Sequence, residues 1–458
     1  MQRSARSSLE SAMSFDLPEL PDGWKFVPLG ECAAPGSISY GVVQPGAPVV
    51  AGIPILRVNN FAEGRLDLTD VMRVAPEIEA KYSRTRLVGG EVLLTLVGSV
   101  GQVAEVPMTC AGFNVARAVG VIKPANGIDA KWISICLRSP LSQHLLGSRA
   151  NTTVQTTINL KDVRALPVPI APAAERGSIC EMVAALDERI NLLRETSATL
   201  EATATALFKS WFVDFDPVRA KSHGLAPAGM DEGTAAMFPD RYDVSEVGDV
   251  PTGWQVHPVG DVVDCVGGAT PDTKDDRYWT PAEHPWTTPK DLSGLASPIL
   301  TSTDRCISSA GLAKIGSGLL PAGTLLMSSR APIGYLAIGQ MPVAINQGYI
   351  AIPPGGRLPP LFMLFWCRQN MDVIKGRANG STFMEISKKA FRPILVLVPP
   401  APIVEAFQAV ASTLFARMVD NNRQAQTLSA LRDLLLPRLI SGQLRLPDAA
   451  LADGFSTH

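Results

Sequence analysis

The side chains most capable of chemistry in this chain are arginines, lysines and amides, and one polar segment that carries them occurs twice. Arginine, alanine and asparagine stand in this order at 149–151 and at 377–379, each time followed by glycine, serine or threonine. Guanidinium, amide and hydroxyl groups bind phosphate oxygens and base edges of nucleic acids. Because both copies keep the segment, phosphate contact or loop structure is favoured over sequence reading, and a surface turn with a scaffolding arginine fits equally well. The candidates from this segment are Arg149, Asn151, Arg377 and Asn379.

Further candidates are basic and amide side chains elsewhere in the two halves of the chain. Phosphate contact also suits the lysines that follow the repeated segment, which are Lys161, Lys388 and Lys389. Base reading is expected from residues that differ between the copies, such as Arg117 and Gln347. These two occupy one position when Pro124 is laid on Pro354. For each single residue, a solvated surface side chain is the alternative. The other candidate readers are Arg57, Asn59, Asn60 and Arg86 in the first copy, and Lys274, Lys290 and Arg330 in the second.

No catalytic set is visible in the sequence, which favours a binding protein over an enzyme. The chain holds no GxxxxGK[ST] motif for ATP, so it is not expected to drive translocation itself. The glycine-rich segment 97–101 follows a strand pattern but opens no helix, so we expect a tight turn there rather than a phosphate-binding loop. The seven cysteines form no CxxC pair and none of the five histidines stands near a cysteine at ligand spacing. We therefore predict that this chain binds no metal or cofactor.

The candidates lie in a framework that the sequence repeats. Each copy is rich in short β-branched runs separated by glycine and proline, and each leads through a Pro-bounded strand into a long helix. A duplicated unit of this kind implies two similar sites on one chain. The tryptophans of the framework (Trp24, Trp211 and Trp254) are assigned to packing rather than to base stacking. The segments 20–31, 89–101 and 148–163 recur as 250–261, 322–334 and 376–391.

Apolar residues at heptad spacing predict a long helix after each copy. The polar middle of the second helix would admit Met418 instead if the pattern shifted by four residues. Net charges of −4 over 172–216 (4 basic against 8 acidic residues) and +2 over 402–446 (5 against 3) favour pairing as an antiparallel coiled coil. Two independent helices, each packed on its own domain, are the alternative. The predicted seam consists of Ile179, Val183, Leu186, Ile190, Leu193, Leu200, Leu207, Ile403, Phe407, Val410, Leu414, Leu428, Leu431 and Leu435.

Charge and composition are those of a globular protein. The chain of 458 residues has a net charge of −2, yet 22–170 (14 basic against 11 acidic residues) and 252–399 (13 against 10) each carry +3. This mild basicity is compatible with nucleic-acid contact by the two copies. The N-terminus shows no apolar signal segment, and the apolar run 394–403 is too short and Pro-rich to cross a bilayer, so a cytoplasmic location is expected.

We expect an α+β fold in which two strand-rich domains are separated by two long paired helices, with an internal pseudo-twofold repeat. Residues between the first helix and the second copy show no seam and many Gly, Ala and Pro, and are interpreted as a linker. The expected division is a tail at 1–20, a domain at 21–171, a helix at 172–213, a linker at 214–249, a domain at 250–400, a helix at 401–446 and a tail at 447–458.

Several motifs follow one another in a fixed order along the chain: Pro-x-Gly-Trp at 21–24 and 251–254, the segments of Ile158 and Ile386 before the Pro-bounded strands, and 207–218, 238–242 and 434–444. Together they resemble the specificity subunits of type I restriction–modification systems, over nearly the whole chain. Pro-x-Gly-Trp alone is a weak signal, but the ordered set around long helices is specific.

The resemblance implies two target-recognition domains, each reading one half of a bipartite, asymmetric sequence in double-stranded DNA. The helices would set the unread spacer and dock two methyltransferase subunits, and two motor–nuclease restriction subunits would join them. S-adenosylmethionine, ATP and Mg²⁺ would be bound by these partners and not by this chain. The alternatives are a tandem-domain scaffold that binds only proteins, and a self-sufficient DNA modification or nicking enzyme.

Overall fold

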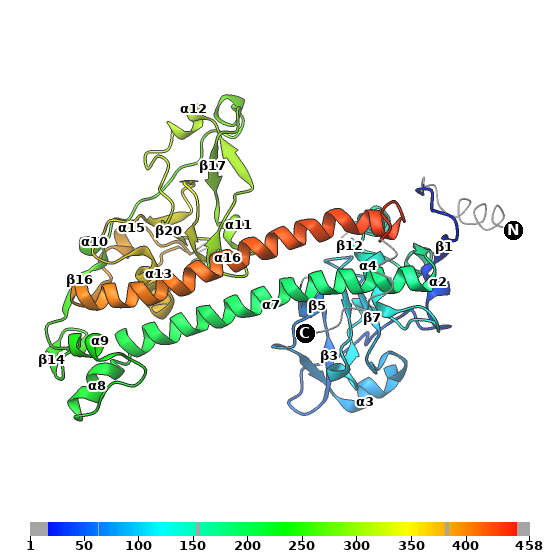
Figure 1. Cartoon of the computed structure of the whole chain (residues 1–458), viewed down its shortest axis with the longest axis horizontal. Coiled ribbons are helices and arrows are strands. Elements are labelled where there is room, and N and C mark those ends of the chain that lie inside the picture. Colours follow the sequence, from blue (N-terminus) through cyan, green and yellow to red (C-terminus); the bar gives the residue numbers. More distant parts are fainter. Residues whose placement is uncertain (1–16, 63, 153–155, 381–383, 447–458) are drawn as a thin grey trace. The chain divides into compact units, whose positions relative to one another are not determined.

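The computed structural model shows an α+β chain with two long helices, α7 (Ala173–Phe212) and α16 (Ala401–Ile440) (Figure 1). The chain forms two compact units: unit 1 holds Met1–Arg189 and Thr427–His458, and unit 2 holds Ile190–Gln426. Each unit contains one strand-rich domain and one end of each long helix. Among the described residues, no helix is long and apolar enough to cross a membrane. The structure describes residues 17–62, 64–152, 156–380 and 384–446.

Unit 1 contains small sheets and short helices. Its strands are β1 (Lys25–Pro28), β2 (Ser39–Tyr40), β3 (Ile53–Leu56), β4 (Phe61–Ala62), β5 (Arg65–Leu66), β6 (Met72–Val74), β7 (Val92–Thr95), β8 (Val103–Glu105), β9 (Asn114–Val115), β10 (Val119–Ile122), β11 (Asn151–Thr152), β12 (Thr156–Thr157) and β13 (Pro167–Ile170). Its short helices are α2 (Leu29–Cys32), α3 (Pro76–Glu79), α4 (Ala130–Arg138), α5 (Pro140–Arg149) and α6 (Leu160–Arg164), with 3₁₀ turns η1 (Val58–Asn60), η2 (Ala80–Thr85) and η3 (Met108–Cys110). The sheet orders are β2-β10-β7-β8 and β6-β3-β9, and the strand pairs are β1-β13, β4-β5 and β11-β12.

Unit 2 has a corresponding set of elements. Its strands are β14 (Tyr242–Ser245), β15 (Gly248–Pro251), β16 (Gln255–Pro258), β17 (His284–Thr287), β18 (Ile299–Leu300), β19 (Arg305–Ile307), β20 (Leu325–Ser328), β21 (Leu336–Gly339), β22 (Ala344–Ile345), β23 (Tyr349–Ile352) and β24 (Leu395–Val398). Its short helices are α8 (Asp216–Ser222), α9 (Glu232–Met237), α10 (Val259–Val262), α11 (Pro289–Leu292), α12 (Ser309–Leu312), α13 (Pro360–Gln369), α14 (Met371–Gly376) and α15 (Lys388–Phe391), with the 3₁₀ turn η4 (Asp276–Tyr278). The sheet orders are β18-β21-β20-β23 and β19-β17-β22, and the strand pairs are β14-β15 and β16-β24.

The internal repeat is confirmed by the sheet topology. The run β10-β7-β8 of unit 1 has the order of β23-β20-β21 in unit 2, and β6-β3-β9 has the order of β19-β17-β22. The register agrees as well, because Thr95 lies opposite Val119 as Ser328 lies opposite Tyr349. One sheet edge differs: β2 pairs with β10 in unit 1, whereas β18 pairs with β21 in unit 2. The two domains therefore share a central framework and differ at its edge.

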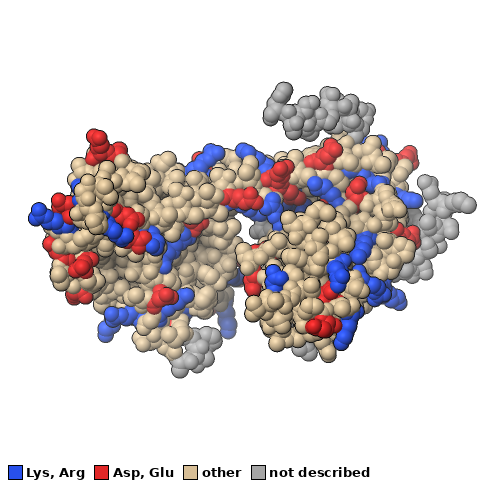
Figure 2. All heavy atoms as spheres, turned by 90° about the horizontal axis from the view of Figure 1, so that it is seen from below, with Lys and Arg blue, Asp and Glu red and all other residues tan. Residues whose placement is uncertain are grey.

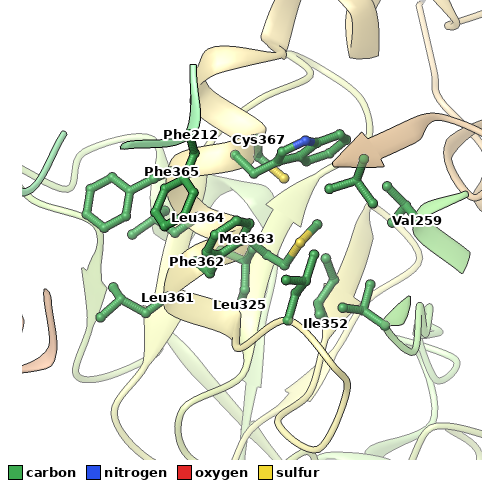
Figure 3. Packing of buried hydrophobic residues seen from close by; sticks show 14 of the residues in the cluster. Phe212, Val259, Leu325, Ile352, Leu361, Phe362, Met363, Leu364, Phe365 and Cys367 are labelled. Carbon is green, nitrogen blue, oxygen red and sulfur yellow. The ribbon is translucent and has the colours of Figure 1, made fainter. Parts of the chain in front are cut away.

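Burial of apolar side chains stabilises each domain. In unit 1, Trp24 packs edge-on against Trp132, with ring centroids 6.2 Å apart. In unit 2, Trp211 and Trp254 belong to a larger cluster, and Figure 3 shows the part of it around Phe362. All three framework tryptophans are buried, as the sequence predicts.

The two long helices pack against each other in an antiparallel direction, as predicted. In unit 2, the Nδ2 of Asn421 donates to the Oγ of Ser197 at 3.3 Å, and Met418 packs near Leu200. Residues that come later along α7 thus meet residues that come earlier along α16. Asn421 and Ser197 are both buried, so they form a polar layer in an otherwise apolar contact.

In unit 1, a carboxylate joins both helices to the strand-rich domain. Asp187 of α7 accepts hydrogen bonds from Arg432 of α16 at 2.6 Å and from Arg138 of α4 at 2.9 Å. The structural equivalent of Arg138 in unit 2 is Arg368 of α13, which donates to Glu201 of α7. Arginines at the same place in the repeat therefore tie each domain to the acidic helix, and the opposite charges of the two helices meet at Asp187.

Burial agrees with the predicted helix seam at most positions and disagrees with it at two. Val410 is 45 % exposed and Leu431 is 43 % exposed, so neither is buried as a seam position should be. After Phe407 the inward step is four residues, to Ala411, and Met418 is buried, as the shifted pattern predicts. The seam positions that are buried or half-buried are Ile179, Val183, Leu186, Ile190, Leu193, Leu200, Leu207, Ile403, Phe407, Leu414, Leu428 and Leu435.

The segment interpreted as a linker, 214–249, packs on unit 2 instead of merely connecting two domains. It contains α8, α9 and β14, and β14 pairs with β15. Val218 and Phe238 are 0 % and 1 % exposed, and the ring of Phe238 lies 5.2 Å from that of Trp211. The segment shows no heptad seam, yet burial of Val218 and Phe238 is enough to pack it on unit 2.

Candidate nucleic-acid interface

Three loops of each domain are joined by the same backbone hydrogen bonds, and we call this arrangement the loop frame. It comprises the loop after β7 or β20, the loop before β10 or β23, and the described end of the segment before α6 or α15. The bonds, from N–H to carbonyl, are Leu96 to Ala118 (2.7 Å) and Ile158 to Leu96 (3.0 Å) in unit 1, and Ser329 to Gly348 (2.8 Å) and Ile386 to Ser329 (3.0 Å) in unit 2.

A buried hydroxyl closes the first loop of the frame in each copy. Thr95 and Ser328 are both 0 % exposed. The Oγ of Ser328 accepts from the N–H of Tyr335 at 2.8 Å and donates to the carbonyl of Pro332 at 2.7 Å. Thr95 makes the same two bonds, to the residues seven and four positions further along. The tight turn expected at 97–101 is therefore a turn that a side-chain hydroxyl holds closed.

Close backbone contact adds a fourth segment to the frame. A Cβ on Gly41 would lie 2.0 Å from the carbonyl oxygen of Val115, and one on Gly268 would lie 1.8 Å from that of Ile345. In both copies the N–H of the next residue donates to this carbonyl. Only glycine leaves room for such an approach. It brings the segment after Gly41 or Gly268 next to the loop that carries Arg117 or Gln347.

Three candidate base readers of unit 1 differ in whether they already have a partner within the protein. Arg117 stands next to Ala118 in the loop frame, and its side chain is exposed, as is that of Asn59 in η1. Arg57 lies at the start of η1 and pairs with the exposed Asp70 at 3.3 Å. Arg117 and Asn59 are thus available to a ligand, whereas Arg57 already has a partner within the protein.

Asn60 is a correction to the sequence-based candidates, because it is buried and its amide is engaged. Its Nδ2 donates to the carbonyls of Asp67 and Asp70 at 3.0 and 2.9 Å, and its Oδ1 accepts from the N–H of Arg57 at 2.9 Å. Asp291 of unit 2 does the same for the N–H three residues before it. Asn60 therefore stabilises a loop and does not read a base. The sequence held a signal for this role, because Asn60 and Asp291 both provide a side-chain oxygen at the same position of the two copies.

Arg86 is held by a buried carboxylate. Its Nε donates to the Oε1 of Glu79 at 2.9 Å and its Nη2 donates to the other oxygen, while the Nδ2 of Asn114 donates to Oε1 at 2.9 Å. Glu79 is 1 % exposed, whereas the side chain of Arg86 is 46 % exposed. The hydrogen bond from Arg86 lowers the pKa of Glu79, burial opposes this, and Asn114 adds to the lowering. Arg86 therefore has a structural partner as well as an exposed side.

A Glu79→Gln variant is expected to be less stable at pH 7 by about 1–2 kcal/mol, a value reduced by the exposure of Arg86. Because the pKa of Glu79 is lowered on folding, its ionised form stabilises the protein above its ordinary value of 4.5, and this contribution is lost as the pH falls through the lower, folded value. Urea unfolding at pH 7 and pH 3 measures the difference. Asp70→Asn is the matched control, because Asp70 is 84 % exposed and should matter little. Equal losses in the free energy of unfolding for Glu79→Gln and Asp70→Asn at pH 7 would contradict a stabilising role of the buried Glu79 carboxylate.

In unit 2 the loop frame brings Arg330 and Gln347 close in space, since the residue before Arg330 bonds to the residue after Gln347. The Nη1 of Arg330 lies 3.8 Å from the Oε2 of Glu385. The Oε1 of Gln347 accepts from the hydroxyl of Thr270 at 2.5 Å. The two other candidate base readers of this unit are exposed outside the frame, and they are Lys290, which pairs with Asp304 at 3.6 Å, and Lys274.

The repeated Arg-Ala-Asn segment leads into a short antiparallel pair in both copies. Asn379 and Glu385 exchange backbone hydrogen bonds of 2.9 and 3.0 Å, and Asn151 pairs with Thr157. The side chain of Asn151 lies outside the described residues. This geometry fits both a structural turn and a phosphate contact. The arginines precede the pair at the ends of two helices, and they are Arg149 on α5, half-exposed, and Arg377 after α14, exposed.

Two exposed lysines occupy one position of the repeat. Lys161 and Lys389 lie on α6 and α15, which begin at equivalent capping residues. Asn159 accepts from a backbone N–H at 2.9 Å and Ser387 does so at 3.2 Å. Lys388 is exposed beside them. All three lysines follow the loop frame directly.

Sequence reasoning missed residues that hold the frame. Arg164 donates to the carbonyl of Ile38 at 2.6 Å, and Arg392 donates to that of Cys265 at 2.9 Å. Both stand five residues after the capping residues, so an alignment of the copies would have found them. Glu385, the partner of Arg330, was also missed.

What the loop frame offers is a set of donors and acceptors on loops held by a rigid framework, which suits binding. Among the described residues, no group of three or more His, Cys, Asp or Glu could hold a metal ion. Burial raises the pKa of several cysteine thiols, that of Cys32 to about 11, which keeps them unreactive. On the face in Figure 2, lysine and arginine are interspersed with aspartate and glutamate over a largely uncharged surface.

Comparison with known proteins places the second copy in a described family. The family model "Type I restriction modification DNA specificity domain" matches residues 251–425. The chain is 27 % identical over 338 residues to the type I restriction enzyme HindI specificity subunit of Haemophilus influenzae, covering 65 % of this chain and 72 % of the relative. It is 32 % identical over 187 residues to the MjaIX specificity subunit of Methanocaldococcus jannaschii, covering 40 % of this chain and 42 % of the relative.

A solved structure shares the fold. The crystal structure of the S subunit of a type I restriction–modification system from M. genitalium aligns with a TM-score of 0.52 at 14 % identity, covering 93 % of this chain and 98 % of that one. At this identity the likeness concerns the fold.

Proposed function

The chain belongs to the family of type I restriction–modification specificity subunits, and from that premise we propose that its two domains each read one half of a bipartite, asymmetric sequence in double-stranded DNA. The second domain carries the match to the DNA specificity domain. The first shares the central strand order of both sheets and the same loop frame, which supports the same task.

The observation that carries the proposal is one loop frame built twice with unlike side chains. Arg117 and Gln347 occupy one position, and Val97 and Arg330 occupy another, within the same backbone hydrogen bonds. Base edges in the major groove present distinct patterns of donors and acceptors, so different side chains select different bases. Two unlike readers on one framework account for an asymmetric target.

The long helices set the distance between the two half-sites in this proposal and dock two methyltransferase subunits. Forty helical residues span roughly 60 Å, more than one turn of B-DNA. This chain positions the DNA and performs no reaction itself. The methyltransferases supply S-adenosylmethionine chemistry, and two motor–nuclease subunits with ATP and Mg²⁺ complete the restriction complex.

The test is methylome sequencing of a host that carries the full-length chain and its methyltransferase partner, compared with the same host lacking this chain. We expect a gapped motif of two specified halves that appears only with the chain. An active methyltransferase without any such motif would favour a scaffold that binds only proteins. Methyl transfer or strand cleavage by the purified chain alone would favour an enzyme.

Phosphate contact by the equivalent lysines gives a separate prediction. Lys161→Ala and Lys389→Ala are each expected to weaken DNA binding by the assembled complex at all target sequences alike. The slope of log K against log[salt] should become shallower by about one for each variant. Titrations at several salt concentrations measure this slope. An unchanged slope, or a loss confined to one base position, would contradict phosphate contact.

A further inference from the structure

We propose that Arg330 reads a guanine in the half-site assigned to unit 2, and that Glu385 is a positioning residue that orients its guanidinium group. This inference rests on the proposed function and deepens it by naming the base and the pair of residues that select it. Neither the family match nor the general presence of basic residues identifies this pair.

Arg330 and Val97 occupy the same place in the loop frame. Val97 forms an antiparallel bridge with Thr157, and Arg330 forms one with Glu385. The flanking backbone hydrogen bonds are equivalent in the two copies. One backbone position is thus fixed by the framework, while its side-chain pair changes from valine with threonine to arginine with glutamate. A position that is structurally fixed and chemically different is suited to base selection.

The backbone just after Arg330 is held in an uncommon conformation. Ala331 has a φ of 50°, where unit 1 has Gly98 with a φ of 78°. An alanine is disfavoured there because its Cβ approaches the backbone carbonyl. The hydroxyl of Ser328 closes the turn from both sides by bonding to Pro332 and Tyr335. The surrounding contacts therefore impose this conformation, and the side chain of Arg330 extends from a rigid backbone position.

The contact with Glu385 orients Arg330 without engaging its hydrogen-bond donors. The distance of 3.8 Å is an ion-pair distance and is longer than a hydrogen bond. Both side chains are partly exposed, at 36 % and 45 %. Arg86 of unit 1 differs, because two of its nitrogens donate to the buried Glu79. Arg330 keeps the planar pair of donors that matches O6 and N7 of guanine.

The first test compares methylation motifs of hosts that carry the methyltransferase partner and either the wild-type chain, Arg330→Val or Arg330→Lys. Valine is the residue that unit 1 has at this position. Arg330→Val should reduce the preference for guanine at one position of one half by roughly ten- to a hundred-fold and leave the other half unchanged. Arg330→Lys keeps the charge but loses the planar fork, so it should relax the same position.

A matched control is Arg277→Ala. Arg277 also forms an arginine–carboxylate pair on unit 2, with Asp275 at 2.8 Å, and its side chain is 81 % exposed. It lies outside the loop frame, so its replacement should leave the motif unchanged. If Arg277→Ala also relaxed the preference for this guanine, the loss of any arginine–carboxylate pair on this domain would have the same effect. That result would overturn the proposal.

Glu385→Gln separates a positioning role from a purely structural one. The variant should keep the wild-type melting temperature, relax the same guanine position, and bind nonspecific DNA more tightly because a negative charge facing the phosphates is removed. A lower melting temperature with an even loss at all positions would show a structural role and overturn the assignment of Glu385.

The outcomes for the proposed function and for this inference differ. A wild-type chain that gives no gapped motif would refute the proposed function, and this inference with it. A gapped wild-type motif that Arg330→Val leaves unchanged, or weakens evenly at every position, would refute only the reading of guanine by Arg330.

Discussion

Replacing Phe407 by alanine is expected to lower the free energy of unfolding by about 3–5 kcal/mol. Phe407 of α16 is fully buried, and its ring centroid lies 5.6 Å from that of Phe208, 5.2 Å from that of Phe212 and 6.1 Å from that of Phe362. Figure 3 labels Phe212 and Phe362 of this cluster. The variant removes apolar contact and leaves a cavity where both long helices meet the domain of unit 2. Urea unfolding followed by tryptophan fluorescence measures the loss.

Val410→Ala is the matched control for Phe407→Ala. Val410 lies less than one turn further along α16 and was predicted from the heptad pattern to face the partner helix, yet it is 45 % exposed. Its replacement should change the free energy of unfolding by no more than about 0.5 kcal/mol. Losses of similar size for the two variants would contradict the observed seam and restore the one predicted from the sequence.

Gly268→Ala is expected to have the second largest effect, a loss of stability of about 3 kcal/mol. The new Cβ would lie 1.8 Å from the carbonyl oxygen of Ile345, and this backbone atom cannot move aside without breaking its bond to the N–H of Ala269. The variant should therefore distort the loop frame of unit 2. Thermal unfolding measures the stability, and the methylation motif of the same variant reports on the loops.

Gly294→Ala serves as the control for Gly268→Ala. A Cβ on Gly294 would meet nothing within 4 Å, so the variant should be neutral or slightly stabilising. If Gly268→Ala were as stable as Gly294→Ala, the close approach of Gly268 to the carbonyl oxygen of Ile345 would be absent.

The large features of the fold could be predicted from the sequence because they depend on patterns within one segment. Heptad spacing gives the helices, and the repeated Pro-x-Gly-Trp openings give the two domains. The seam failed at Val410 because Val410 and Ala411 are both apolar, and the pattern allows a step of either three or four residues after Phe407. Only the packing of the partner helix decides between them.

The candidate site could be predicted by residue type but not by role, since the role depends on partners far away in the sequence. Asn60 resembles a base reader in the sequence, but carbonyls seven and ten residues later engage its amide. Glu385 carries the wrong charge for a DNA contact and becomes relevant only through Arg330, 55 residues earlier. Laying one copy on the other would have located Arg164 and Arg392, whose place in the repeat is the same.

The central claim, that each domain reads its own half of the target, is tested most directly by the methylation motifs of Arg117→Ala and Gln347→Ala. These residues are both exposed and occupy one position of the repeated loop frame. We predict that Arg117→Ala relaxes one base position in one half of a gapped motif, and that Gln347→Ala relaxes one position in the other half. Changes of both variants in the same half, or a wild-type motif without two separate halves, would contradict the claim.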